Sequence, residues 1–166
     1  MRYLILSAFI LVTACGRLSD EERKKLRDGM AENKIVKVTD EEIVTTALDK
    51  GRAIYALLEK KKFQTKAVDS IAANESVRIH WTRPGDKNAE AIEQQLIDAY
   101  ITSIITGNLQ DNIQKLYLQN NPANYDSIVY SKPVVTPMPD GVENLEGVWN
   151  IYISKKSVVI AISKQK

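Results

Sequence analysis

The stretch RIHWTR, residues 78–83, gathers most of the side chains that could do chemistry in this chain. It contains the single histidine, His80, together with Trp81, Arg78 and Arg83. Side chains alternate between the two faces of a strand, so Arg78 and His80 would point one way and Trp81 the other. Because arginine offers a bidentate fork to carboxylates and phosphates, the stretch is a candidate binding site for such a group.

The same stretch also has a structural interpretation, which we favour. It can form a surface strand with Trp81 in the core and its arginines paired with Glu90 or Glu93. His80 could serve as a metal or haem ligand only with a second ligand, and for that role the chain offers only Met30, Met138 and tyrosine side chains. We therefore predict no metal and no cofactor.

Motifs of known catalytic chemistry are missing from the sequence. It has no nucleophile elbow, no H-E-x-x-H, no P-loop and no G-x-G-x-x-G. Paired carboxylates such as Glu41 and Glu42 lie at expected helix starts, where the helix dipole already accounts for them. One cysteine and one histidine exclude a cysteine or multi-histidine zinc centre. We predict that the protein is not an enzyme.

The residues before the single cysteine, Cys15, indicate a different chemistry. Residues 1–14 begin Met-Arg, continue with an apolar run and end on small residues, which is typical of a signal peptide and too short to span a bilayer. The following VTACG resembles the lipobox of bacterial lipoproteins. This resemblance implies cleavage before Cys15 and attachment of acyl chains such as palmitate, which anchor a protein without spanning the membrane.

We predict that the rest of the chain consists of a charged tether over residues 15–38 and one domain over residues 39–166. A net charge of +2 indicates no nucleic-acid partner. In a Gram-negative host, Gly16 rather than Asp after the cysteine favours the outer membrane, with the protein facing the periplasm. SDEE at residues 19–22 and TDEE at 39–42 both have the form of a helix capping box.

Helical periodicity comes first in the domain and strand-like segments come last. We predict helices over residues 39–60, about 63–74 and 88–107, the last with Asn88 as its N-cap and Gly107 as a left-handed C-cap. Between the second and third helices, residues 75–83 are expected to form a short strand or an extended link, followed by a turn at Pro84 and Gly85. Residues 108–119 are ambiguous between helix and strand, and 136–147 form an irregular link. Strands are expected at 127–135, 147–154 and 157–163, the last two as a hairpin around Lys155 and Lys156. The predicted fold class is α+β, with N-terminal helices packed on a small antiparallel sheet that ends in a β-hairpin.

Three segments in this order carry a family resemblance: VRIHWTRPGDKNAEAIEQQLIDAY, IVYSKPVV and EGVWNIYISKKSVVIAIS. They resemble the PAS-like periplasmic sensor family, whose members often attach a c-type haem. The resemblance implies a PAS-like fold, a signalling partner, and a candidate ligand site that adds Tyr130 of the Y-x-K-P segment to Arg78, His80, Trp81 and Arg83. The haem-attachment motif is absent, because no Cys or His lies between Pro133 and Gly147.

Two functions therefore stay open at this point. The first is a lipid-anchored envelope lipoprotein with a PAS-like sensory or binding module for a small molecule or a protein. The alternative is a structural accessory subunit of an envelope protein complex. A closed apolar cavity between helices and sheet would favour the first, and a filled core with an exposed apolar patch would favour the second.

Overall fold

The computed structural model describes residues 19–25, 37–118, 121–139 and 141–165. The predicted signal peptide and Cys15 lie outside these residues. The chain divides into two compact units, Met1–Lys37 and Val38–Lys166. In the first unit residues 20–25 are helical, and the capping box is confirmed, because the Glu22 amide donates to Ser19 Oγ at 3.2 Å and the Ser19 amide to Glu22 Oε2 at 2.9 Å.

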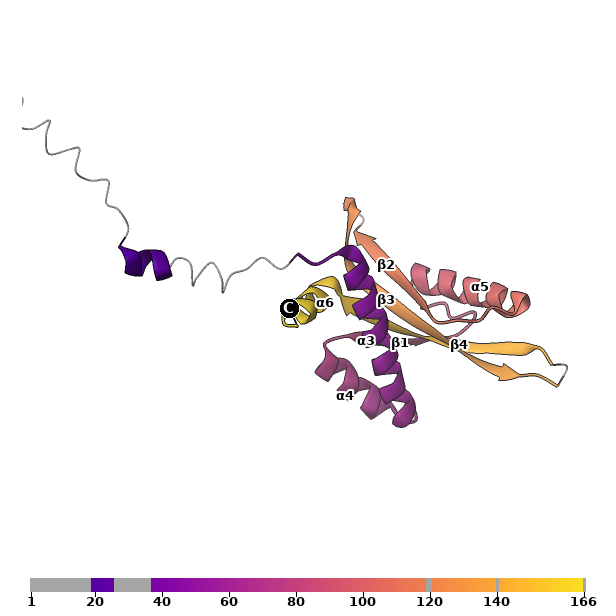
Figure 1. Ribbon diagram of the computed structural model, residues 1–166. Coiled ribbons are helices and arrows are strands. Elements are labelled where there is room, and N and C mark those ends of the chain that lie inside the picture. The colour runs from indigo at the N-terminus through magenta and orange to yellow at the C-terminus, as the bar shows by residue number, and fades with distance from the viewer. Residues whose placement is uncertain (1–18, 26–36, 119–120, 140, 166) are drawn as a thin grey trace, which may run out of the picture. The chain divides into compact units, whose positions relative to one another are not determined.

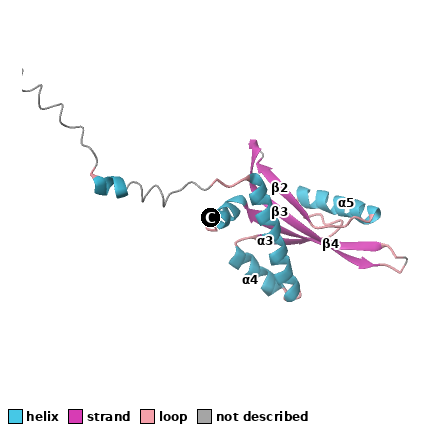
Figure 2. Cartoon of the chain, viewed as in Figure 1, coloured by secondary structure: helices cyan, strands magenta, loops and turns pink. Residues whose placement is uncertain are grey.

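The second unit is an α+β domain built on one antiparallel sheet (Figures 1 and 2). Its elements follow in the order α3 (Asp40–Lys60), α4 (Thr65–Glu75), β1 (Arg78–Thr82), α5 (Ala91–Thr106), β2 (Asn112–Leu118), β3 (Asn121–Pro137), β4 (Glu143–Ser154) and α6 (Lys155–Ser163). None of the helices among the described residues is long and apolar enough to cross a bilayer.

The sheet has the strand order β1-β4-β3-β2, and every neighbouring pair is antiparallel. The long strands β3 and β4 form the centre, with Tyr130 opposite Ile151, and β1 and β2 form the two edges. The ladder between β3 and β4 reaches Pro137 and Glu143, so most of the predicted irregular link is strand. A short turn closes it, in which the Met138 amide donates to the Val142 carbonyl at 2.8 Å.

Helices cover both faces of the sheet, with α3, α4 and α6 on one face and α5 on the other (Figure 1). Alternation along the central strands supplies a core to each side. Ile128, Tyr130 and Ile151 pack with α3 and α6, whereas Val129 and Tyr152 pack with α5. These side chains are 0–7% exposed, so both layers are filled.

Helix α3 begins as its capping box predicts. The Glu42 amide donates to Thr39 Oγ1 at 3.2 Å, and the Thr39 amide donates to Glu42 Oε2 at 2.8 Å. The helix ends after Lys60, where Lys62 and Phe63 adopt positive φ angles of 52° and turn the chain into α4. The first two predicted helices are therefore confirmed close to their expected ends.

Helix α5 confirms its predicted end and corrects its predicted start. Gly107 has a φ of 69° and forms a left-handed C-cap, as expected. The N-cap, however, is Glu90 and not Asn88. The Asn88 amide instead donates to Asp86 Oδ1 at 2.9 Å, in a local turn that delays the helix by two residues.

The predicted terminal hairpin is wrong, because residues 155–163 form helix α6 and not a strand. Both edges of β4 are already paired, one with β1 and the other with β3, so a following strand could not pair with it. As a helix, the segment buries Val158 and Ile162, four residues apart, in the core that it shares with α3. Tertiary packing overrides the β-branched composition here.

Gly51 marks the closest approach of α3 to the sheet. A Cβ atom placed on Gly51 would lie 2.4 Å from Tyr130 Cγ. We predict that Gly51→Ala lowers the free energy of unfolding by about 1–3 kcal/mol, as overpacking of a core does, although alanine favours a helix intrinsically by about 1 kcal/mol.

Urea denaturation of the variant would check this prediction. Ala56→Gly, at an exposed position of the same helix, is the control and should cost about 1 kcal/mol from helix propensity alone. A Gly51→Ala variant that is more stable than the parent would show that α3 does not approach Tyr130 this closely.

Candidate functional site

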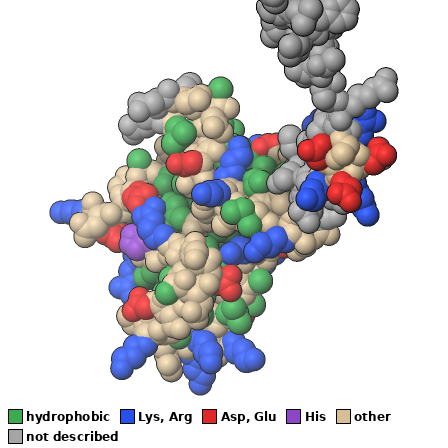
Figure 3. Space-filling model, turned by 90° about the vertical axis from the view of Figure 1, so that its left-hand side faces the viewer, with side chains coloured by type: hydrophobic (Ala, Val, Ile, Leu, Met, Phe, Trp, Pro, Cys, Tyr) green, Lys and Arg blue, Asp and Glu red, His purple; other side chains and the backbone are tan. Residues whose placement is uncertain are grey.

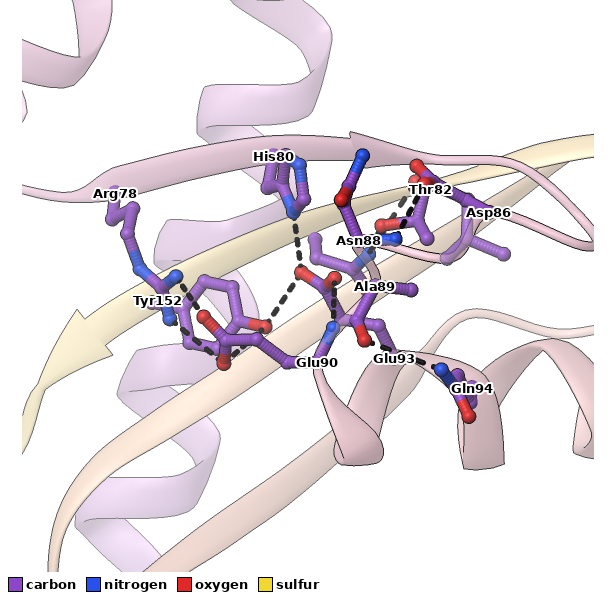
Figure 4. Close-up of polar contacts among 12 residues, drawn as sticks. Arg78, His80, Thr82, Asp86, Asn88, Ala89, Glu90, Glu93, Gln94 and Tyr152 are labelled. Carbon is purple, nitrogen blue, oxygen red and sulfur yellow. Dashed lines mark hydrogen bonds and ion pairs between the residues drawn. The ribbon is translucent and has the colours of Figure 1, made fainter.

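A cluster of polar and charged side chains lies between the sheet and the start of α5 (Figure 4). Alternation along β1 directs Arg78 and His80 toward this side, as predicted, and Tyr152 of β4 points the same way. The start of α5 contributes Glu90 and Glu93. The cluster thus joins three elements that are far apart in the sequence.

Glu93 is the centre of this cluster. Its side chain is fully buried, and His80 Nδ1 lies 2.7 Å from its Oε1. The Tyr152 hydroxyl donates to the same oxygen at 2.8 Å, and the Glu90 amide donates to Oε2 at 3.0 Å. A buried carboxylate is stable only with such partners, so these contacts hold the start of α5 on the sheet.

Arg78 and Glu90 form the outer part of the cluster. Both guanidinium nitrogens Nη1 and Nη2 contact the Glu90 carboxylate, and the guanidinium carbon lies 3.7 Å from the centre of the Tyr152 ring. The fork of Arg78 is therefore already occupied by a carboxylate of the same chain. This is the structural interpretation that the sequence allowed, in which an arginine of the stretch pairs with Glu90.

The pKa values of the acids in this cluster are shifted in consistent directions. Burial acts to raise the pKa of Glu93, but hydrogen bonds from His80, Tyr152 and the Glu90 amide outweigh it and lower the pKa below 4.5. The hydrogen bond from Arg78 likewise lowers the pKa of Glu90. Burial, followed by the hydrogen bond to Glu93, raises the pKa of the Tyr152 phenol. Both carboxylates are thus ionised at neutral pH, and the phenol is protonated.

Two further polar contacts continue along the same face of the sheet. The Tyr100 hydroxyl lies 2.7 Å from Ser131 Oγ and donates to the Ser131 carbonyl at 2.9 Å, and burial raises its pKa to about 12. Asn150 Nδ2 donates to Thr82 Oγ1 at 3.0 Å. Asn150 Oδ1 is buried and has no hydrogen-bond partner among the described residues. These contacts fasten α5 and β1 to the central strands.

His80 is the member of the cluster that could react with something outside it. Because an ionised Glu93 can only accept, Nδ1 carries the proton, and neutral imidazole then leaves the lone pair on Nε2. The His80 side chain is 40% exposed. The arrangement could exchange a proton or bind a donor at Nε2. The described residues contain no group of three or more His, Cys, Asp or Glu that could hold a metal ion.

The five candidate ligand residues do not come together. Arg78 and His80 share the cluster, but Trp81 lies on the opposite face, with its ring 5.0 Å from that of Trp149. Tyr130 lies on that opposite face too, below α3, and its hydroxyl donates to Asp111 Oδ2 at 3.1 Å. Arg83 is exposed beyond the end of β1. A single ligand could not contact all five.

Most of the polar contacts in the buried layer could not be predicted from the sequence. Glu90 and Glu93, three residues apart at a helix start, were recognisable as partners for the arginines. The contacts of Tyr100 with Ser131 and of Asn150 with Thr82 join residues 31 and 68 positions apart, which local patterns do not reveal. Tyr152 faces the side of α5 and Trp149 the opposite side, as the three-residue separation within a strand predicts.

No protein-family model, no curated protein and no solved structure matches this chain. The arguments below therefore rest on its own residues and their geometry.

Glu93→Gln should separate the charge of Glu93 from its packing. A carboxylate with a lowered pKa stabilises the fold above its ordinary pKa of 4.5, and this stabilisation is lost as the pH falls through the folded value. We predict that the variant loses about 1–3 kcal/mol of unfolding free energy at pH 7, and that this difference from the parent shrinks toward pH 3.

Urea denaturation at both pH values measures the effect. The control is Glu59→Gln, which changes an exposed carboxylate of α3 and should stay within about 0.5 kcal/mol of the parent at either pH. An equal loss from Glu93→Gln at pH 3 and pH 7 would assign the effect to packing and contradict the role of the charge.

Proposed function

We propose that this protein is a lipid-anchored bacterial envelope lipoprotein whose α+β domain, PAS-like in fold, binds a protein partner. The domain then acts as an accessory or sensory module of an envelope complex and does not catalyse a reaction. Its attachment to the membrane would be through acyl chains on Cys15, which the lipobox-like VTACG indicates. The domain's role rests on a surface feature of the described residues.

That feature is an exposed apolar patch at one end of the domain. It consists of Ile101 and Ile105 on α5 and Met138 and Val142 at the β3–β4 turn, which are 41%, 80%, 46% and 54% exposed. Large aliphatic side chains gathered on a surface mark a contact site for a partner. We call these four residues the α5–hairpin patch, and it is the observation that carries the proposal.

The interior of the domain favours the same function over the binding of an enclosed small molecule. Both layers between helices and sheet are filled by side chains that are almost fully buried. The polar cluster is also internally satisfied, with Arg78 held by Glu90 and His80 by Glu93. A filled core with an exposed apolar patch is the combination expected of an assembly module.

The PAS-like part of the proposal is supported by where the resembling segments lie. Tyr130–Pro133 falls within β3, and Gly147 begins the regular part of β4, so these parts of two segments form the central pair of the sheet. The end of the third segment, residues 155–163, is helix α6 and not the predicted hairpin strand. The resemblance to this family also implies a sensory role for the domain. Here a sensed signal would reach the protein through a partner that contacts the domain.

The anchoring proposal predicts the behaviour of Cys15→Ser. Without the sulfur, acyl chains cannot be attached and the lipoprotein peptidase has no cleavage site. The variant should therefore keep its signal peptide or leave the membrane fraction. Cell fractionation and intact mass measurement would show this. A variant that fractionates and migrates like the parent would contradict lipid attachment at Cys15.

Cross-linking in intact membranes tests the binding function itself. We expect the lipidated protein to be cross-linked to one or a few fixed partners, and native mass spectrometry of residues 15–166 with Cys15→Ser to show the mass of the polypeptide alone. A protein that stays monomeric in membranes and carries a bound small molecule would overturn the assembly function in favour of small-molecule sensing.

A further inference from the structure

The four residues of the α5–hairpin patch lie at neighbouring positions along α5 and the β3–β4 turn. Ile101 and Ile105 are one helical turn apart on α5. Ile105 and Val142 line the same hollow of about 780 Å³, together with Ile104 and Leu109. Met138 is joined to Val142 through their backbone hydrogen bond. In Figure 1 the end of α5 and the β3–β4 hairpin project toward the same side of the domain.

The two segments that carry this surface bear charges of one sign. Residues 88–114 and 133–154, which contain α5 and the hairpin, hold seven of the 21 acidic residues and none of the 23 Lys and Arg residues. Glu143 lines the hollow beside Ile105. Asp98 is exposed two turns before Ile105 on the same side of α5, and it shares a second hollow with the exposed Lys87. Neither carboxylate forms an ion pair with another described residue. The patch therefore has an acidic rim.

Basic side chains are concentrated elsewhere. Seen from the side of α3, α4 and α6, Lys and Arg side chains lie across the face and gather at its lower end (Figure 3). Lys60, Lys61, Lys62 and Lys66, at the junction of α3 and α4, are all exposed. The domain is thus asymmetric in charge, because the two segments that carry the apolar patch contain no Lys or Arg. An asymmetry of this kind selects and orients a partner of the opposite sign.

From this combination we infer that the α5–hairpin patch binds a basic amphipathic segment of a partner protein. The apolar face of that segment covers Ile101, Ile105 and the hollow, and its Lys or Arg residues pair with Asp98 and Glu143. Aliphatic anchors one turn apart, beside a hollow, suit an amphipathic helix laid into a groove. An anionic lipid surface does not fit, because the acidic rim would be repelled by it. This inference rests on the proposed binding function and specifies the partner's chemistry.

Three synthetic peptides would test the inference. Each is about 18 residues long, or five helical turns. All three have leucine at the same positions, and the other positions are all Lys in the first peptide, all Gln in the second and all Glu in the third. Calorimetry with residues 15–166 carrying Cys15→Ser should show that the Lys peptide binds about tenfold more tightly than the Glu peptide. The difference should shrink as the salt concentration rises, because screening weakens exposed charge pairs.

Ile105→Lys is the variant that locates the binding. It removes the most exposed aliphatic side chain of the patch and adds a repelling charge, while lysine near a helix C-terminus suits the helix dipole. Binding of the Lys peptide should weaken about tenfold. Ile160→Lys, at a 45% exposed isoleucine of α6, is the matched control and should leave binding unchanged. Amide NMR spectra would confirm that both variants are folded.

The outcomes separate this inference from the proposed function. If the Gln or Glu peptide binds as tightly as the Lys peptide and Ile105→Lys abolishes it, the patch is a docking surface and the basic partner is wrong. If Ile160→Lys weakens binding equally, or the protein binds phosphatidylglycerol vesicles through Ile105, the inference is overturned. If none of the three peptides binds, the inference is overturned as well. The proposed function is overturned only by a different result, the absence of cross-linked partners in membranes.

Discussion

Strand β4 is paired along both of its edges, and the rest of the domain is arranged around this constraint. One edge pairs with β1 and the other with β3, so β4 is interior to the sheet. Each of its residues must then face one of two covered sides. Ile151 and Ile153 enter the core beneath α3 and α6, and Tyr152 enters the layer beneath α5. A single strand thereby divides the domain into two layers of different chemistry.

The two layers are stabilised in different ways. The side of α3, α4 and α6 is mostly aliphatic and aromatic, with Phe63, Trp81 and Trp149 adjacent to one another. The side of α5 combines an apolar core with hydrogen bonds among buried polar groups, and the ionised carboxylate of Glu93 is the most costly of them to bury. Its three partners come from β1, β4 and the start of α5 itself. Any motion of α5 away from the sheet would leave Glu93 without its contacts to His80 and Tyr152.

The buried polar cluster and the exposed apolar patch lie at opposite ends of α5. The buried carboxylate of Glu93 lies in the first turn of α5, where its contacts with His80 of β1 and Tyr152 of β4 hold the helix to the sheet. The exposed isoleucines lie at the other end of α5, beside the β3–β4 turn. There the β3–β4 hairpin extends beyond the edge strands β1 and β2. A firmly held helix presents a rigid row of side chains, which lowers the entropy lost when a partner binds.

Local features of the sequence were sufficient for several elements. The capping box at Thr39, the left-handed cap at Gly107 and the alternation in β1 each depend on neighbouring residues alone, and each was predicted correctly. The sequence by itself also determined the charge asymmetry, because residues 88–114 and 133–154 contain no Lys or Arg. Only the tertiary structure decided that residues 155–163 are helical, that Tyr130 lies away from His80, and that Ile105 faces outward. The physical reason is that strand pairing and burial depend on residues far apart in the chain, and in α6 they outweigh local preferences for strand.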